Sequence, residues 1–236
     1  MAITRKLNLR TGRSIWQSRP CPRVAESRLS RDIVCDALVV GAGISGALIA
    51  ESLADAGLRV VVLDRRGAVR GSTVASTALI QYELDTPLTK LARMEGRERA
   101  ERMWRRSRLA VDALRERSRQ LEIQSDQVNR DSLYLSGNVL DRAALLREAD
   151  ARRRAGFNTS FLEQREVEAR FGVRGRTAIL SYDNFSADPR RLAAGFLREA
   201  VARQARVYAP VEVCEIRATR RGVEAGKETE GDASFE

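Results

Sequence analysis

The sequence predicts an α/β fold whose first ordered unit is a strand, a helix and a second strand. Residues 36–40 and residues 59–63 are short apolar runs rich in β-branched side chains, which is typical of parallel strands buried on both faces. Between them, residues 47–56 carry apolar side chains at helical spacing and end at Gly57, and glycine commonly follows the last turn of a helix. Together these segments predict a βαβ unit.

Length and composition narrow the possible functions. A chain of 236 residues can form one or two domains with a sizeable core, and no apolar run reaches the roughly 18 residues of a membrane-spanning helix. The chain has no histidine, which excludes Ser-His-Asp catalysis and His-ligated zinc. Its three cysteines lack a C-x-x-C spacing and suit a reducing compartment. We therefore expect a cytoplasmic protein without a metal site.

The formal net charge of +10 is concentrated near the N-terminus. Residues 1–32 hold eight basic and two acidic side chains, whereas the arginines of the rest alternate with Asp and Glu, as on a solvated surface. We therefore expect no nucleic-acid partner. Residues 1–32 also lack apolar periodicity, which predicts an irregular arm lying on the domain through Ile15 and Trp16. A transit peptide remains the alternative, because no acidic residue precedes Glu26.

Glycines at fixed spacing connect the first strand to the helix. Gly41 allows a tight turn, Gly43 lets the backbone approach a pyrophosphate, and Gly46 allows the helix to pack closely on the strand. The N-terminus of the helix then offers free N–H groups to phosphates. Asp64 ends the second strand, where an acid accepts hydrogen bonds from an adenosine ribose. The pattern predicts a dinucleotide site, and a glycine turn in another α/β protein is the alternative.

The segment after Asp64 argues against a nicotinamide cofactor. A nicotinamide-binding half normally continues into another helix and a third parallel strand. Residues 66–80 instead carry two glycines and four hydroxyl side chains, whose oxygens and neighbouring amides can form a second phosphate cradle. An ordinary surface loop is the alternative, although the segment is too apolar to be wholly solvated.

Two later helices are predicted from the residues typical of helix N-termini. Thr86 and Pro87 predict the N-cap and first residue of a helix, and Asp188 and Pro189 do the same for a helix that runs to about residue 204. Residues 88–121 are expected to be helical with one break at a glycine. Further strands are expected at 133–135, 157–162, 178–180, 206–208 and 211–218, with helices at 143–155 and 165–171.

Residues 36–64, 70–77 and 188–192 together resemble the D-amino acid oxidase/glycine oxidase superfamily of FAD-dependent oxidoreductases. The resemblance implies a Rossmann-like FAD-binding domain with a partial α+β substrate domain, and FAD as the cofactor. It also implies a small-molecule substrate, an amine or amino acid that is oxidised by hydride transfer to flavin N5. Many relatives have glycine after the second loop, where this chain has Ala78.

The resemblance implies a set of cofactor-binding residues and leaves the catalytic residues unknown. Tyr82, Arg130 and Tyr134 are candidates for the substrate side, with structural roles as the alternative. The implied cofactor ligands are Gly41, Ala42, Gly43, Ser45 and Gly46 at the pyrophosphate, Asp64 at the adenosine ribose, Arg65 beside the adenosine, Ser72, Thr73, Ser76 and Thr77 along the pyrophosphate and ribityl chain, and the backbone of Val211 at adenine.

The same resemblance suggests how the chain is divided. We expect a basic arm at 1–32, an FAD-binding βαβ unit and phosphate loop at 33–85, a partial substrate domain at 86–185, a return to the FAD domain at 186–225 and a polar tail at 226–236. Family members are much longer, so we expect a natural truncation, a frameshifted reading frame or a fragment. The alternative function is a non-catalytic remnant that binds dinucleotide or a partner chain without turnover.

Overall fold

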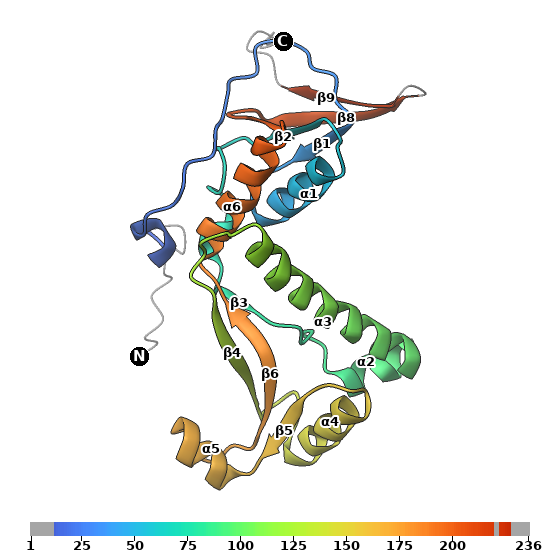
Figure 1. The fold of residues 1–236 in the computed structure, drawn as a ribbon. Coiled ribbons are helices and arrows are strands. Elements are labelled where there is room, and N and C mark those ends of the chain that lie inside the picture. The colour runs from blue at the N-terminus through green and yellow to red at the C-terminus, as the bar shows by residue number, and fades with distance from the viewer. Residues whose placement is uncertain (1–11, 220–221, 228–236) are drawn as a thin grey trace, which may run out of the picture. The chain divides into compact units, whose positions relative to one another are not determined.

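The computed structural model describes residues 12–219 and 222–227 (Figure 1). Its contacts divide the chain into two compact units, which are described separately. The division falls between Thr77 and Ala78 rather than between residues 85 and 86, because β3 (Leu79–Ile80) pairs with β6 (Ala178–Ser186) of the second unit. The first unit comprises Met1–Thr77, Ile123–Ser125 and Asp188–Glu236, and the second comprises Ala78–Glu122 and Asp126–Ala187.

The first unit contains the predicted parallel sheet. Its strands β1 (Ala37–Val40), β2 (Val60–Leu63) and β7 (Arg206–Tyr208) are ordered β1-β2-β7. Leu63 lies opposite Val40 on one side and Tyr208 on the other, so the carboxyl ends of all three strands meet at one edge. Helices α1 (Ile44–Asp55) and α6 (Pro189–Ala202) pack against each other. The predicted βαβ unit is confirmed.

The remaining segments of the first unit are short. The described residues of the arm, 12–32, form one 3₁₀ turn, η1 (Ile15–Ser18), and a single parallel bridge from Ser27 to Tyr208. Ile15 is 69% exposed, so Trp16 rather than Ile15 attaches this turn. A second 3₁₀ turn, η2 (Ser72–Ala75), lies in the loop after β2, and β8 (Val213–Thr219) pairs with β9 (Gly222–Lys227) as an antiparallel hairpin.

Hydrogen bonds between Asp36 and Arg59, here called the Asp36 clasp, join the residues that directly precede β1 and β2. The Arg59 backbone N–H donates to Asp36 Oδ2 at 2.8 Å, and the guanidinium donates to Oδ1 at 2.6 Å. The side-chain hydrogen bond from Arg59 is the main reason that the pKa of Asp36 falls to about 2. The register of the two strands is thus set before their first paired residues, Ala37 and Val60.

The second unit is an antiparallel sheet covered by helices. β6 occupies the centre and pairs with β3, β4 (Val128–Leu135) and β5 (Thr159–Leu162). β3 was not expected, and β4 and β6 extend beyond the predicted 133–135 and 178–180, because polar residues continue the pairing past the apolar runs. The helices are α2 (Leu88–Glu95), α3 (Arg97–Gln120), α4 (Arg142–Arg154) and α5 (Gln164–Phe171).

Three aromatic side chains form the centre of the second unit. The Phe157 ring stacks on Tyr82 and meets Trp104 edge-on, with centroid distances of 5.6 Å in both cases. Burial raises the pKa of Tyr82 to about 12, and the Glu83 carboxylate adds to the increase. Tyr134 packs against a neighbouring apolar cluster. The Tyr82 ring is therefore part of the core of this unit, and the substrate-side role expected for Tyr134 stays a prediction.

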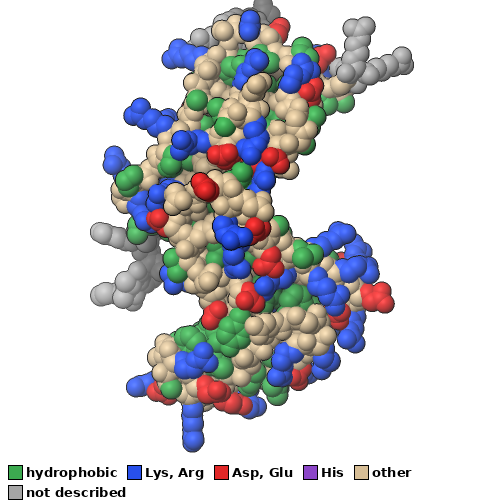
Figure 2. Space-filling model, in the orientation of Figure 1, with side chains coloured by type: hydrophobic (Ala, Val, Ile, Leu, Met, Phe, Trp, Pro, Cys, Tyr) green, Lys and Arg blue, Asp and Glu red, His purple; other side chains and the backbone are tan. Residues whose placement is uncertain are grey.

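Charged side chains alternate along α3, as the sequence predicts. Arg97 and Arg105 both pair with Glu101 at 2.8 Å, each four residues away. The hydrogen bond from Arg97 is the main cause of the lowered pKa of Glu101. Figure 2 shows basic and acidic side chains interspersed over the visible face. This pairing is typical of a solvated helix surface.

The three cysteines are free thiols. Burial raises the pKa of Cys21 and of Cys35, which makes both poorer nucleophiles. In the described part of the chain, no cluster of three or more cysteine or carboxylate side chains is arranged to hold a metal ion. No helix within the same residues has the length and hydrophobicity needed to span a bilayer.

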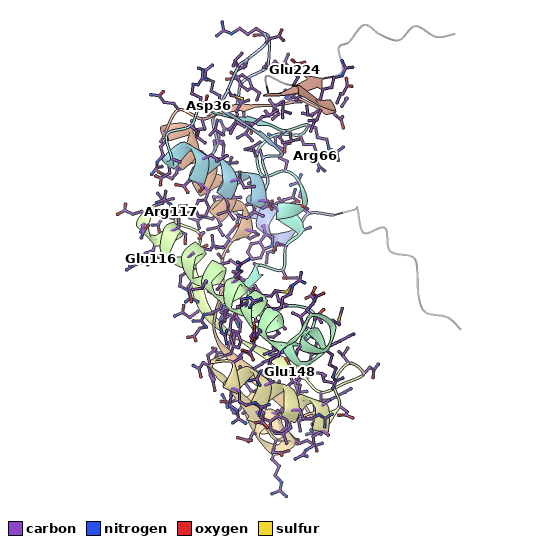
Figure 3. All side chains as sticks on the ribbon, turned by 90° about the vertical axis from the view of Figure 1, so that its right-hand side faces the viewer. Asp36, Arg66, Glu116, Arg117, Glu148 and Glu224 are labelled. Atoms are coloured by element: carbon purple, nitrogen blue, oxygen red, sulfur yellow. The ribbon has the colours of Figure 1, made fainter. Side chains whose placement is uncertain are left out.

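The N-terminus of α2 is capped from α4 rather than by Thr86. Figure 3 labels Glu148, which belongs to α4. Its carboxylate accepts the N–H groups of Leu88 at 2.7 Å and Thr89 at 2.8 Å, and it pairs with Arg152 at 2.8 Å. Both charged side chains are almost fully buried. The N-cap is Pro87, which has no side-chain oxygen to accept these bonds. The sequence signal at Thr86 and Pro87 therefore predicts the helix correctly, but its prediction of Thr86 as the N-cap is wrong.

Replacing Glu148 by Ala should lower the free energy of unfolding by about 3–5 kcal/mol, because it leaves the Arg152 charge buried and unpaired. Urea denaturation measures the change. The matched control is Glu98→Ala, which removes an exposed partner of Arg102 and should cost at most about 0.5 kcal/mol. Equal losses in the two variants would contradict the assigned role of Glu148.

The Asp36 clasp should make stability depend on pH in the acid range. Because the folded-state pKa of Asp36 is below the ordinary 3.8, its contribution is complete above pH 3.8 and is lost as pH falls through about 2. Arg59→Ala should move this pKa back towards 3.8, as measured by NMR titration of the carboxyl carbon. A pKa that stays at about 2 in the variant would show that Arg59 is not the cause.

Candidate cofactor site

The candidate site lies in the first unit, at the carboxyl ends of its three parallel strands. The Gly41 N–H donates to the Leu63 carbonyl at 2.7 Å, and the Asp64 N–H donates to the Tyr208 carbonyl at 3.0 Å. The chain after β7 returns to the same place, since the Val211 N–H donates to the Asp64 carbonyl at 2.9 Å. Carboxyl ends of parallel strands are where ligands bind in open α/β sheets.

The three glycines of the first loop occupy positions that side chains cannot easily fill. Gly41 has a φ of +103°, in the left-handed region. A Cβ on Gly46 would lie 1.8 Å from the Gly41 carbonyl oxygen, and one on Gly43 would lie 3.0 Å from Thr73 Oγ1. The first turn of α1 can therefore approach both the preceding loop and the second loop closely.

The N-terminus of α1 faces the second loop and carries no acidic residue in its first turn. Gly43 is the N-cap and has no side chain to accept a bond, so the buried hydroxyl of Thr73 accepts the Ile44 N–H at 3.0 Å. The next N–H groups, those of Ser45 and Gly46, have no partner within the helix. These donors and the helix dipole favour an anion at this end of α1.

Asp64 joins the first loop to the segment after β2. Its Oδ2 accepts the Ala42 N–H at 2.8 Å, while its Oδ1 accepts the N–H groups of Arg66 at 2.7 Å and Gly67 at 2.9 Å. A carboxylate has about four acceptor sites, so one remains for a ligand hydroxyl. The predicted bond to a ribose stays a prediction, and the bonds to both loops are a role that the sequence did not predict.

The second loop contributes one buried and several exposed hydroxyl groups. Thr73 lies against α1, whereas the side chains of Ser72, Ser76 and Thr77 are exposed to solvent. The Ser76 N–H donates to the Thr73 carbonyl at 3.4 Å and closes η2. The structure therefore brings Thr73 directly to the first loop and leaves the other three hydroxyl residues at the surface beside it.

The two residues expected near adenine lie at the same edge of the sheet. Arg65 is exposed and pairs with Glu212 at 3.2 Å, which links the segments after β2 and β7. The Val211 side chain is buried with Val61 and Leu63, and its N–H already bonds the Asp64 carbonyl. Only the carbonyl of Val211 is left for the predicted contact with adenine, which stays a prediction.

Sequence reasoning missed Glu26 as a contact between the arm and these loops, and it placed Trp16 on the domain without predicting its partner. Glu26 Oε1 accepts the Ala68 N–H at 2.9 Å, and the Trp16 indole donates to the Ser76 carbonyl at 2.9 Å. Both partners lie more than 40 residues away, so no local pattern marks them. The one available signal for Glu26 was that it is the first of only two acidic residues in a basic arm.

The residues present fit a dinucleotide. A Cβ on Gly43 or Gly46 would crowd the neighbouring loop, and an N-terminal helix end without acidic residues favours the charge of a pyrophosphate. The nearby Asp64 carboxylate is already neutralised in part by three backbone N–H donors. The pyrophosphate would therefore meet donors rather than an uncompensated negative charge.

Together, the parallel βαβ topology, the glycine loop and the acid after the second strand define a dinucleotide-binding protein of the Rossmann type. A family model described as FAD dependent oxidoreductase matches residues 36–235. The chain belongs to this family, whose cofactor is FAD. The resemblance that the sequence motifs indicated is thereby confirmed.

Several relatives show how much of the family fold is shared. Glycine oxidase from Geobacillus kaustophilus has a TM-score of 0.62 and 22% identity, over 82% of this chain and 51% of that chain. L-amino acid deaminase from Proteus myxofaciens, solved with anthranilate, has a TM-score of 0.67 and 16% identity, over 92% and 46%. A Bacillus subtilis (strain 168) protein named as a Rieske 2Fe-2S iron-sulfur protein, YhfW, is 20% identical over 82% of this chain and 37% of its own length. The chain spans about half or less of these relatives.

Gly46→Ala should disrupt the site, because its Cβ would overlap the Gly41 carbonyl. We expect the free energy of unfolding to fall by about 1–3 kcal/mol through overpacking, and FAD binding to be lost. Thermal denaturation and FAD titration measure the two effects. Gly137→Ala is the control, because its Cβ would come no closer than 3.6 Å to a neighbour. A Gly46→Ala variant that matches this control would contradict the close approach.

Proposed function

We propose that this protein is an FAD-dependent oxidoreductase that oxidises an amine or an amino acid. The observation that carries the proposal is the pair of loops joined by Asp64, with Gly43 facing Thr73 across the end of α1. When bound, FAD would supply the redox chemistry by accepting a hydride at N5 from the α-carbon of the substrate. The chain's own residues bind and orient that group.

Each loop has a distinct part in holding the cofactor. The amides of Ser45 and Gly46 and the Thr73 hydroxyl would bind the pyrophosphate, since they surround the N-terminus of α1. Ser72, Ser76 and Thr77 would extend this contact along the ribityl chain. The remaining acceptor site of Asp64 would bind the ribose, with Arg65 and the carbonyl of Val211 on the adenine side.

The charge of Asp64 favours FAD over a cofactor with a 2′-phosphate. A ribose with free hydroxyls can donate to the carboxylate, whereas a 2′-phosphate would be repelled by it. This preference supports FAD and disfavours NADP. The charge of Asp64 does not distinguish FAD from NAD. The observations that favour FAD over NAD are the family membership and the loop at 66–77.

The substrate class is supported by the names of the relatives. They include glycine oxidases, an L-proline dehydrogenase and L-amino acid deaminases, all of which act on amino acids by their names. At identities of 16% to 22%, these likenesses show the fold alone. An amine or amino acid substrate is therefore part of the proposal for this chain. The three free thiols support the proposed location in the cytoplasm.

FAD titration of the purified protein tests the proposal, with the change that binding causes in the flavin absorption band at about 450 nm as the signal. We expect saturable binding by the wild type and none by Gly43→Val, whose side chain would fill the approach to Thr73. Gly137→Val is the matched control and should bind as the wild type does. Bleaching of this absorption by an amine or amino acid under anaerobic conditions tests turnover.

The possible outcomes separate the alternatives. A folded wild type that does not bind FAD, or a Gly43→Val variant with unchanged affinity, would overturn the site. FAD binding that no amine or amino acid bleaches would favour the non-catalytic alternative.

A further inference from the structure

The basic arm contacts both segments that form the candidate site. In η1, the Trp16 indole N–H donates to the Ser76 carbonyl of the second loop at 2.9 Å. Further along the arm, Glu26 Oε1 accepts the Ala68 N–H at 2.9 Å, directly after Gly67, which Asp64 binds. Each arm residue thus holds a backbone group of a loop, and backbone groups set the direction in which a loop presents its amides.

Trp16 is itself held in place by the start of α6. The Arg190 guanidinium donates to the Trp16 carbonyl at 2.9 Å, and the Arg190 backbone N–H donates to Asp188 Oδ1 at 3.0 Å. Asp188 is buried and pairs with Arg19 of the arm at 3.8 Å. The contact between Trp16 and Ser76 is therefore one bond in a connected set rather than an isolated bond at the surface.

The other end of the arm is fixed to the sheet. The Ser27 N–H donates to the Val207 carbonyl at 3.0 Å, and the Ser27 carbonyl accepts the Ala209 N–H at 3.0 Å. Ser27 is adjacent to Glu26, so the bridge to β7 places the Glu26 carboxylate beside Ala68. Residues 16–27 are consequently tied to the domain at both ends.

The backbone after the second loop needs such support. Ala78 has a φ of +69°, a conformation that glycine adopts readily and that a residue with a Cβ adopts at a cost. Conformations of this kind persist only where neighbouring contacts determine them. The Trp16 bond to Ser76 lies two residues before Ala78, and the Ala187 N–H binds the Ala78 carbonyl at 3.2 Å.

We propose that the arm is part of the cofactor site, and that Trp16 and Glu26 hold residues 67–77 in the conformation that binds FAD. The inference rests on the proposed function. Trp16 and Glu26 act on FAD through the loops, so they are positioning residues. Coupling of this kind is reciprocal: FAD stabilises the arm contacts by the same factor by which the arm strengthens FAD binding.

FAD titration of single variants tests the proposal, with flavin fluorescence as the signal. Trp16→Phe keeps an aromatic ring and removes the indole N–H, and it should weaken FAD binding by about 3- to 10-fold, the effect of one lost hydrogen bond. Glu26→Ala should weaken binding by a similar factor, whereas Glu26→Gln retains an acceptor oxygen and should restore most of the affinity. Ile15→Ala is the matched control, since Ile15 is in the same turn and largely exposed.

A second measurement does not depend on affinity. Amide hydrogen exchange should show that FAD slows exchange in residues 14–18 as well as in residues 71–77 of the wild type. In Trp16→Phe, the protection of residues 14–18 should be lost while that of residues 44–47 is retained. Thermal denaturation shows whether each variant is folded.

The outcomes separate the inference from the proposed function. Wild-type protein that binds FAD while Trp16→Phe and Glu26→Ala bind it with the affinity of Ile15→Ala would overturn the inference alone. Absence of FAD protection in residues 14–18 of the wild type would also overturn it. A folded wild type without FAD affinity would overturn the proposed function, together with the inference that rests on it.

Discussion

Three backbone N–H groups converge on the Asp64 carboxylate, and the shape of the candidate site depends on this convergence. One comes from Ala42 in the glycine loop, and the others come from Arg66 and Gly67 after β2. The sheet brings the two loops to the same edge but does not join them. Because hydrogen bonds to a charged acceptor are stronger than neutral ones, the Asp64 side chain can hold both loops. Together with Thr73, whose hydroxyl accepts the Ile44 N–H, this carboxylate fixes the loop after β2 relative to the N-terminus of α1.

The remaining features of the first unit depend on that arrangement. Gly46 allows α1 to start against the Gly41 carbonyl, and Thr73 supplies the acceptor that the N-cap glycine lacks. The site is thus assembled from backbone donors whose directions are set by a few side chains. A histidine is unnecessary for such a site, because the bound cofactor supplies the redox chemistry and the protein supplies orientation.

How much the sequence predicts depends on how far apart the interacting residues are. The βαβ unit, the glycine loop and the helix after Asp188 follow from patterns within a few residues, and the structure contains all three. The cap of α2 by Glu148 joins residues about 60 positions apart, as does the contact of Trp16 with Ser76. Such pairs are chosen by tertiary packing, which local periodicity does not encode. The bond of Asp64 to Ala42 spans 22 residues and falls under the same limit, whereas its bonds to Arg66 and Gly67 are local, two and three residues apart.

The FAD dissociation constant of Asp64→Ala, compared with that of the wild type, tests the central claim most directly. The variant removes all three acceptor contacts, so the account predicts that affinity falls by at least about 10-fold, the effect of a single bond to a charged group. Asp36→Ala, which removes the carboxylate at the opposite ends of the strands, should leave the dissociation constant unchanged. A folded Asp64→Ala variant with wild-type affinity would show that the loops hold FAD without this carboxylate, and would contradict the account.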